Sequence, residues 1–227
     1  MIGGNMASRI IALLLLLTAA SPAWAAPVSG NKVIDNDRVA VFDIKLKPGD
    51  SAPVTPTYLE SVILYLEGGH FRTMSNGKVH SVTHAFGDAV FMPRGSAAFD
   101  TLEGGGSNTM AHEILVVLKD HPLPAIANKS GFPDAFPRPG SVRVLDNERV
   151  TVWNYSWTKG VPTKMHFHDK DVVVSYRYDG ALKSVTPDGK SVINPDKAGQ
   201  ITFNKANRIH YEELMDARQS AVILELK

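Results

Sequence analysis

The chain has 227 residues, no cysteine and a formal charge of +1, from 24 basic and 23 acidic residues. The absence of cysteine excludes disulfides, thiolate metal ligands and a lipoprotein anchor, so core burial alone must stabilise the fold. The charges form no block of one sign, which argues against nucleic acid or an anionic membrane surface as a partner.

The first 25 residues have the pattern of a secretory signal peptide. One basic residue, Arg9, precedes the apolar run from Ile10 to Ala20, and small residues around Trp24 predict cleavage after Ala25. The run is shorter than the roughly 20 apolar residues of a membrane-spanning helix. We therefore expect an exported protein without a membrane anchor, either periplasmic or secreted.

The rest of the sequence alternates short apolar segments with turn-forming residues. In chain order, the first half contains RVAVFDIKL (38–46), SVILYL (61–66), AVFMP (89–93) and ILVVL (114–118). The second half contains RVTVWNYSW (149–157), VVVSY (172–176), QITF (200–203) and AVILEL (221–226). Clusters such as SNGK (75–78) and PDGK (187–190) separate them. This pattern predicts an all-β sandwich or barrel.

The two halves are copies of one unit. VIDNDRVAVF (33–42) and VLDNERVTVW (144–153) are identical at six of ten positions, at an offset of 111 residues. Glu60 pairs with Asp171 at the same offset. We expect two domains, 26–120 and 142–227, because so long a repeat argues against a continuous solenoid. Between them, residues 121–141 contain five prolines and are predicted to form an ordered linker.

Three histidines of the second unit are candidate metal ligands. His166 and His168 are two residues apart at the start of a predicted strand, so their side chains share one face. His210 is the only later histidine, and it follows a strand and a turn that could bring it back beside the pair. Three neutral imidazoles would form an open-sided site for a divalent transition metal, with positions left for a small molecule.

These residues resemble the motifs of the cupins. Gly160, His166, His168 and Gly180 fit the first cupin motif, G-x5-H-x-H-x3,4-E-x6-G. Gly199 and His210 fit the second motif, G-x5-P-x-G-x2-H-x3-N, and GDAVFMPRG (87–95) carries its glycines and proline in the first unit. The resemblance implies a bicupin, with two tandem cupin (double-stranded β-helix, or jelly-roll) barrels, and a possible homodimer. It adds Mn to the metals Zn, Cu, Fe and Ni that imidazole ligation favours.

The chain departs from the cupin pattern in both units. The resemblance places the ligand positions of the first unit at Thr55, Thr57 and Ala98, which implies a degenerate N-terminal barrel without metal ligands. In the second unit it places Val173 at the position of the motif glutamate, and Asp171 is a candidate substitute with a different spacing. The alternative is a vestigial cupin whose histidines only fill a polar pocket.

Further side chains could contact a ligand or orient the site. Trp153 and Tyr155 share a strand face with Trp157, where a core role and an aromatic wall beside the metal both stay open, and Tyr176 has the same ambiguity. Glu212 has the parity to join His210 inside the barrel, as an orienting group or proton acceptor, or it is a solvated turn residue. Arg208 and Tyr211 are expected at the surface.

We therefore expect an exported bicupin that binds a divalent metal through His166, His168 and His210 and works as a small-molecule binding protein. The alternative is a metal-dependent dioxygenase, isomerase or lyase that acts on a small oxygenated substrate. The missing glutamate and the lack of a clear general base favour the binding protein.

Overall fold

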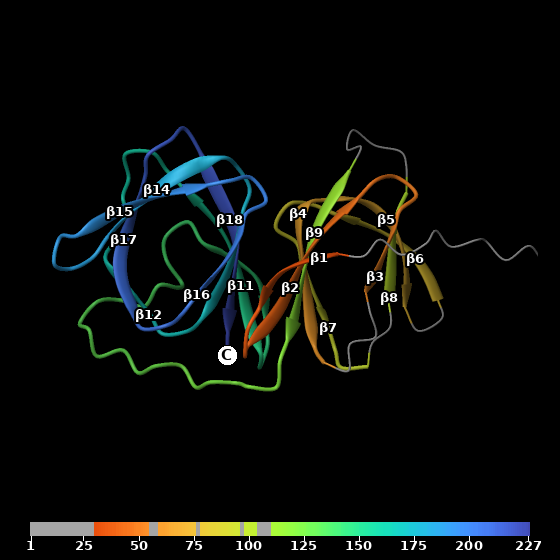
Figure 1. The fold of residues 1–227 in the computed structure, drawn as a ribbon, viewed down its shortest axis with the longest axis horizontal. Helices are drawn as coiled ribbons and strands as arrows, with labels where there is room; N and C mark the ends of the chain where they lie inside the picture. The colour runs from red at the N-terminus through yellow and green to blue at the C-terminus, as the bar shows by residue number, and fades with distance from the viewer. Residues whose placement is uncertain (1–29, 55–58, 76–77, 96–97, 104–109) are drawn as a thin grey trace, which may run out of the picture.

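The computed structural model describes residues 30–54, 59–75, 78–95, 98–103 and 110–227 (Figure 1). The expected signal peptide and two expected ligand positions of the first unit, Thr55 and Thr57, lie outside these ranges, and Ala98 begins a strand. Over the described ranges the regular secondary structure consists of strands. No helix there is long and apolar enough to cross a membrane.

In its described residues the N-terminal barrel has nine strands in two sheets. In chain order they are β1 (Asn31–Asp35), β2 (Val39–Leu46), β3 (Ser51–Val54), β4 (Ser61–Glu67), β5 (Gly69–Ser75), β6 (Lys78–His84), β7 (Ala89–Met92), β8 (Ala98–Leu102) and β9 (Ala111–Leu118). One sheet has the order β1-β2-β9-β4-β7 and the other β3-β8-β5-β6. Neighbouring strands pair antiparallel throughout.

The C-terminal barrel repeats this topology strand for strand. Its strands are β10 (Val142–Asp146), β11 (Val150–Trp157), β12 (His166–His168), β13 (Val172–Tyr176), β14 (Gly180–Val185), β15 (Ser191–Asp196), β16 (Ile201–Asn204), β17 (Arg208–Leu214) and β18 (Gln219–Leu226). The sheets have the orders β10-β11-β18-β13-β16 and β12-β17-β14-β15. Even a register shift recurs, between Lys32 and Ile34 and between Arg143 and Leu145. The predicted all-β fold of two tandem barrels is confirmed.

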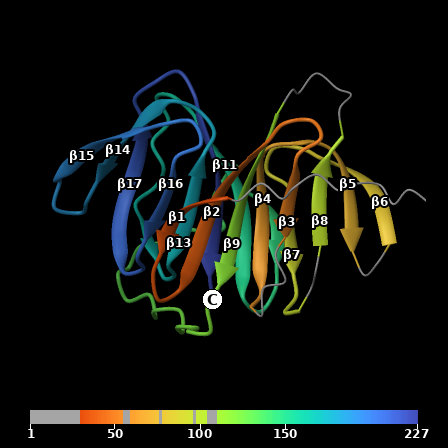
Figure 2. The ribbon, with the colours of Figure 1, turned by 45° about the vertical axis from the view of Figure 1, so that its right-hand side comes forward.

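A large apolar core lies between the two barrels, where their five-stranded sheets face each other (Figure 2). Strand β4 illustrates the arrangement, because Val62 and Leu64 enter this shared core whereas Ile63 and Tyr65 enter the core of the N-terminal barrel. A strand buried on both faces needs apolar residues at every position. The shared core thus explains why SVILYL is continuously apolar.

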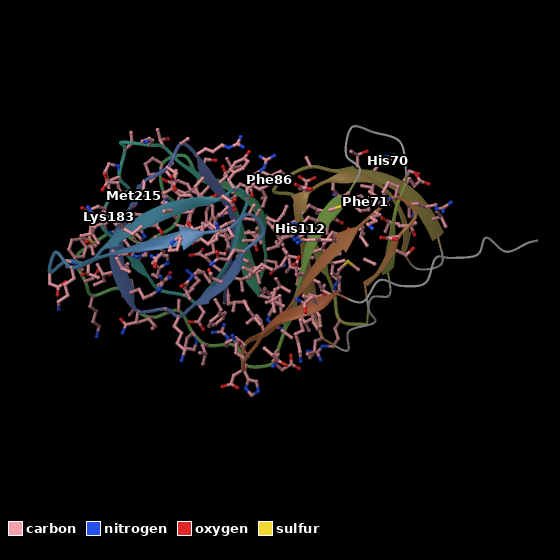
Figure 3. All side chains as sticks on the ribbon, turned by 45° about the horizontal axis from the view of Figure 1, so that its top comes forward. His70, Phe71, Phe86, His112, Lys183 and Met215 are labelled. Atoms are coloured by element: carbon pink, nitrogen blue, oxygen red, sulfur yellow. The ribbon has the colours of Figure 1, made fainter. Side chains whose placement is uncertain are left out.

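Other side chains fix the contact between the barrels at its upper edge (Figure 3). The guanidinium of Arg177 lies over the ring of Phe86, 4.0 Å from its centroid. A Cβ atom at Gly199 would lie 2.7 Å from the ring of His112, so a glycine there allows the close approach. With φ at +76°, Gly199 also has a backbone conformation that other residues rarely adopt.

The proline-rich segment lies against the C-terminal barrel, along the bottom of Figure 1. Its backbone hydrogen-bonds on both sides of Phe167 in β12, from the Phe167 N–H to Pro133 O and from the Ala135 N–H to Phe167 O, each at 2.8 Å. Ala135 and Phe136 are buried in the core of that barrel. The segment therefore extends the sheet edge beside β12 and brings Phe136 and Arg138 to the mouth of the barrel.

Candidate metal site

The three histidines converge inside the C-terminal barrel. Strand β12 pairs antiparallel with β17 so that His166 lies opposite His210, and His168 follows on the same face. Their Nε2 atoms are 3.2 Å apart between His166 and His168 and 3.0 Å apart between His168 and His210. All three side chains are buried. Their candidate ligand atoms lie within 4.8 Å of one another, and among the described residues these histidines form the group that could hold a metal ion.

Hydrogen bonds and burial bear on the protonation of these imidazoles. The Nδ1 atom of His166 donates to Lys164 O at 2.8 Å, which leaves its Nε2 lone pair free, and Nδ1 of His210 forms a hydrogen bond with Ser184 Oγ at 2.7 Å. Burial lowers the pKa of His166, lowers that of His168 well below its usual value and lowers that of His210 to about 4. The three rings are therefore neutral at pH 7, the form in which imidazole binds a metal.

A divalent metal fits this donor set. Two imidazole nitrogens that share a first-row metal at about 2.1 Å lie about 3.0–3.4 Å apart, depending on the coordination geometry. The observed separations of 3.2 and 3.0 Å fall in this range.

The histidines open onto a cavity of about 290 Å³. It is lined by His168 and His210 and by polar or charged side chains that include Tyr176, Ser184, Asn194, Asp196, Gln200, Thr202, Asn204, Arg208 and Glu212. Burial raises the pKa of Tyr176, so its hydroxyl stays protonated, and burial raises the pKa of Asp196 to about 6. The cavity can therefore enclose a small polar molecule beside the histidines.

Glu212 is the carboxylate nearest to the candidate ligand atoms. Its Oε1 lies 3.9 Å from His210 Nε2, whereas its Oε2 accepts hydrogen bonds from Arg138 Nη1 at 3.1 Å and Trp157 Nε1 at 2.9 Å. Burial acts to raise the pKa of Glu212, but the positive charge of Arg138, the two neighbouring histidines and the hydrogen bond from Trp157 together outweigh it, and the pKa falls to about 2. The ionised Glu212 thus lies at the edge of the site, outside the three-histidine group.

Arg138, which the sequence did not indicate as a site residue, holds Glu212 in place. Its guanidinium carbon lies 3.9 Å from the ring centroid of Tyr155 and 4.6 Å from that of Phe136. Aromatic faces attract a cation in this arrangement and immobilise it. Because Arg138 and Phe136 belong to an irregular segment, no hydrophobic period could have placed them in the site.

The structure places Asp171 away from the metal site. Its Oδ2 accepts a hydrogen bond from Arg38 Nη1 of the other barrel at 2.9 Å, and its Oδ1 accepts one from the Ala206 N–H at 2.7 Å. The proposed substitution of Asp171 for the glutamate ligand is therefore wrong, since both carboxylate oxygens are engaged elsewhere.

The cavity-facing position on β13 also differs from the expected one. Val173 is fully buried in the core between the barrels, whereas Val172 and Val174 line the cavity. A glutamate at position 173 would point away from the histidines. The motif allows three or four residues between the second histidine and the glutamate, so the glutamate position is Val172 or Val173. Both residues are valine, and only Val172 faces the cavity.

The predicted aromatic and basic residues take different positions. Tyr176 lines the cavity, whereas Trp153 packs on Phe136 in the barrel core and donates its indole N–H to Glu225. Tyr155 lines a second cavity of about 450 Å³ on the other side of His166. The surface position expected for Arg208 is wrong, because this residue shares the strand face of His210 and Glu212 and lines the metal-site cavity. That parity was readable from the sequence.

Comparison with known proteins supports the fold. No protein-family model matches the sequence, and no curated protein matches it significantly. A cupin 2 conserved barrel domain protein from Leptotrichia buccalis is 12% identical, with 88% of each chain covered and a TM-score of 0.53. Oxalate decarboxylase from Bacillus subtilis, which has Mn(II) centres, is 14% identical over 84% of this chain and 68% of its own, with a TM-score of 0.57.

A third structure covers one unit. A cupin domain from Bordetella pertussis Tohama I is 31% identical, with 40% of this chain and 97% of that domain covered and a TM-score of 0.36. The two barrels of identical topology and the three converging histidines agree with the fold of the first two structures. The chain belongs to the cupin superfamily and has two cupin barrels in tandem.

Proposed function

We propose that the C-terminal barrel binds a divalent transition metal through the Nε2 atoms of His166, His168 and His210. The observation that carries this proposal is the convergence of three neutral, buried imidazoles, with Nε2 of His168 3.2 Å from that of His166 and 3.0 Å from that of His210. The donor set suits Zn, Cu, Fe and Ni, and the cupin resemblance adds Mn. The Mn(II) centres of the B. subtilis oxalate decarboxylase, a protein of the same fold, are in keeping with it.

The function that this geometry supports best is metal-dependent binding of a small oxygen-containing molecule. Three histidines would leave one side of a bound ion open, and two of them, His168 and His210, line the cavity of about 290 Å³. The volume is at the small end of the range for ligand sites, about 300–1,000 Å³. A bound divalent ion would supply Lewis acidity toward an oxygen of the ligand.

Metal analysis tests this proposal. The chain, purified without added ions and then treated with a chelator, is titrated with Zn²⁺ and Mn²⁺ by calorimetry beside a His166→Ala/His210→Ala double variant. A His80→Ala variant is the matched control, because His80 is exposed on β6 in the other barrel. We expect wild type and the control to bind one ion and the double variant to bind none. Equal, weak binding by all three would contradict the proposal.

An enzyme is the second candidate function, and the position of Glu212 favours it. A carboxylate oxygen 3.9 Å from a candidate ligand atom is close enough to accept a proton from a molecule held beside the ion. Arg138 and Trp157 keep this carboxylate ionised and oriented. A binding protein has no need of such a base.

The enzyme candidate is tested with oxalate, the substrate named for the B. subtilis structure of the same fold. Release of CO₂ is followed for Mn²⁺-loaded wild type and Glu212→Gln, with metal content measured for both. CO₂ release by wild type that falls at least about 100-fold in Glu212→Gln, at equal metal content, would support a catalytic Glu212. No release by metal-loaded wild type leaves metal-dependent binding as the function and removes oxalate as a substrate.

We also propose that the chain is exported and acts on small molecules rather than on nucleic acid. The signal-peptide pattern of residues 1–25 and the even mixture of charges support these assignments. A homodimer, which the cupin resemblance implies, would have to use a surface other than the five-stranded sheets, because these bury their apolar faces against each other.

A further inference from the structure

A second cavity lies next to the metal-site cavity. It has a volume of about 450 Å³ and is lined by the proline-rich segment 121–141, by the end of β11 and by the loop that connects β11 to β12. Of the three candidate metal ligands, His166 lines this cavity, whereas His168 and His210 line the other one. The second cavity is therefore separate from the space that the proposed function assigns to a metal-bound ligand.

Hydrogen bonds hold two walls of the second cavity in place. On one side, the hydroxyl of Ser141 donates to Arg138 O at 2.7 Å and accepts the Arg138 N–H at 3.1 Å, which closes the turn at the end of the proline-rich segment. On the other side, the N–H of Thr163 donates to Glu212 O at 2.9 Å, and its hydroxyl accepts the Glu212 N–H at 2.8 Å. Small-molecule sites are usually preformed in this way, with volumes of about 300–1,000 Å³.

Rings form a large part of the lining. Tyr155 contributes an aromatic ring, and the pyrrolidine rings come from Pro133, Pro137, Pro139 and Pro162. A Cβ atom at Gly140, where φ is +82°, would be in van der Waals contact with the Tyr155 ring at 3.8 Å, so the glycine leaves the space beside this ring free. Proline and aromatic rings pack well on one another. The lining therefore suits a flat, apolar ring.

The hydroxyl of Tyr155 has no partner within the described part of the chain. Arg138 covers one face of the ring, with its guanidinium carbon 3.9 Å from the centroid, and Trp157 contacts the ring at 5.0 Å between centroids. The hydroxyl itself forms no hydrogen bond with another described residue, although partly buried tyrosines normally pair it. Burial raises the pKa of Tyr155, so the hydroxyl keeps its proton and can both donate and accept at neutral pH.

The charges around the second cavity balance. Arg138 is neutralised by Glu212 through their ion pair at 3.1 Å. Lys164 and Asp134, which line the cavity and are both exposed, carry opposite charges. An ion that entered this apolar space would lose hydration without gaining a free counter-charge, which is unfavourable. An uncharged molecule therefore suits the cavity better than an ion.

We propose that the second cavity binds an uncharged aromatic molecule that carries a hydroxyl group, of the class of phenols and naphthols. The ring of this molecule packs against Tyr155 and the prolines, and its hydroxyl forms a hydrogen bond with the Tyr155 hydroxyl. This inference goes beyond the proposed function and does not depend on a bound metal. It assigns to the proline-rich segment 121–141 the role of supplying one wall of a ligand site.

Calorimetry on the metal-free chain tests the inference, with 2-naphthol as the probe. Two molecules with the same ring skeleton are titrated beside it: decahydro-2-naphthol, whose rings are not flat, and 2-naphthoate, which is charged. The variants are Tyr155→Phe, which removes only the hydroxyl, and Val161→Trp, which fills cavity space from a position that is 62% exposed. Their controls are Tyr211→Phe on β17 and Val142→Trp on β10, where the valine is 59% exposed. Circular dichroism checks that each variant folds.

We expect wild type and both controls to bind one 2-naphthol per chain and to bind the other two molecules about 10-fold more weakly, because these lack either the flat ring or the neutral charge. Tyr155→Phe should weaken 2-naphthol binding about 2- to 10-fold, the effect of one neutral hydrogen bond. Val161→Trp should abolish it. The affinity of Val161→Trp for Zn²⁺ should stay unchanged, since Val161 does not line the metal-site cavity.

Three results would each overturn the inference: no binding of 2-naphthol by wild type, equally tight binding of decahydro-2-naphthol or 2-naphthoate, or wild-type affinity for 2-naphthol in Val161→Trp. If Val161→Trp does not fold, Tyr155→Phe decides, because unchanged affinity there contradicts the assigned hydrogen bond. The titrations are made without a metal, so their failure would leave the proposed metal site standing, and a chain that binds no metal could still bind 2-naphthol.

Discussion

Arg38 and Asp171 form an ion pair between the two barrels, with 2.9 Å from Nη1 to Oδ2 and side chains only 10% and 11% exposed. A second pair, Arg149 with Glu60, crosses the interface in the opposite direction. Each residue is 111 positions from its counterpart, so the two pairs are equivalents in the repeat. Both repeats carry an acidic residue at this position, Glu60 and Asp171, because each forms an ion pair with an arginine of the other barrel.

Loss of Arg38 should destabilise the whole chain. Arg38→Ala leaves the buried Asp171 carboxylate without its cation, which typically costs about 3–5 kcal/mol. Urea unfolding measures the free energy, with Lys190→Ala as the control, since the exposed Lys190–Asp188 pair should contribute less than about 1 kcal/mol. An Arg38→Leu/Asp171→Leu double variant should lose less than Arg38→Ala. Equal effects of Arg38→Ala and Lys190→Ala would show that the interface pair is unimportant.

Ser184 should support metal binding without touching the ion. Its hydroxyl oxygen lies 2.7 Å from Nδ1 of His210. When a metal takes the Nε2 lone pair, the proton of the neutral ring is on Nδ1, and the hydroxyl accepts it in a hydrogen bond. Loss of such a partner usually lowers metal affinity about 10- to 100-fold. Calorimetry with Zn²⁺ should show this for Ser184→Ala and not for Ser191→Ala, an exposed position on the neighbouring β15. Unchanged affinity in Ser184→Ala would argue against this role of the hydrogen bond.

Arg138 and Glu212 should be strongly coupled. Arg138→Met removes the cation that compensates the Glu212 carboxylate, whose side chain is 16% exposed, and we expect a loss of about 3 kcal/mol in unfolding free energy at pH 7. Most of this loss should disappear in Arg138→Met/Glu212→Gln, where the unpaired charge is gone. Additive effects in this cycle would contradict a direct interaction. Arg143→Met serves as the exposed control.

Asp196 should make stability depend on pH. Burial raises its folded-state pKa to about 6, above the usual value of 3.8, so the folded state binds the proton more tightly than the unfolded state. The contribution to stability is complete below about pH 3.8 and is lost as the pH rises through 6. Asp196→Asn cannot titrate, so its stability relative to wild type should increase from pH 4 to pH 7.5 in urea unfolding.

An exposed aspartate provides the contrast for this experiment. The hydrogen bond from Lys190 lowers the pKa of Asp188, so its contribution is present at neutral pH and is lost on acidification. The stability of Asp188→Asn relative to wild type should therefore decrease as the pH rises, and only within the acidic range. A flat difference between Asp196→Asn and wild type would mean that the pKa of Asp196 is not raised.

The fold could be predicted from the sequence because the chain contains two copies of one repeat. Alternating apolar residues predicted strands, the 111-residue repeat predicted two units, and the recurring register shift in β1–β2 and β10–β11 shows how closely the copies agree. His166, His168 and His210 were also predictable, since strand parity places the first pair on one face. Glu212 is two residues from His210 on the same strand, so its side chain was expected on the same face, inside the barrel. Arg208 is also two residues from His210, and the same reasoning would have placed it there.

Errors arose where side-chain direction depends on more than parity. Because both faces of β13 are apolar, the sequence could not show that Val173 faces the other barrel and Val172 the cavity. Asp171 was interpreted as a ligand candidate because it lies near the expected glutamate position. Its actual partner, Arg38, is 133 residues away, and no sequence pattern pointed to their pairing. The segment 121–141 was predicted to be a linker, and nothing in its irregular sequence indicated that it lies beside β12.

The sequence by itself determined the strands, the duplication and the set of candidate ligands, because these follow from local periodicity and from comparison of the chain with itself. Only the tertiary structure decided that Glu212 is held by Arg138 and that Asp171 belongs to the interface. These outcomes depend on contacts between segments distant in the chain. The burial and pairing of a charge are properties of the packed molecule, which no single stretch of sequence contains.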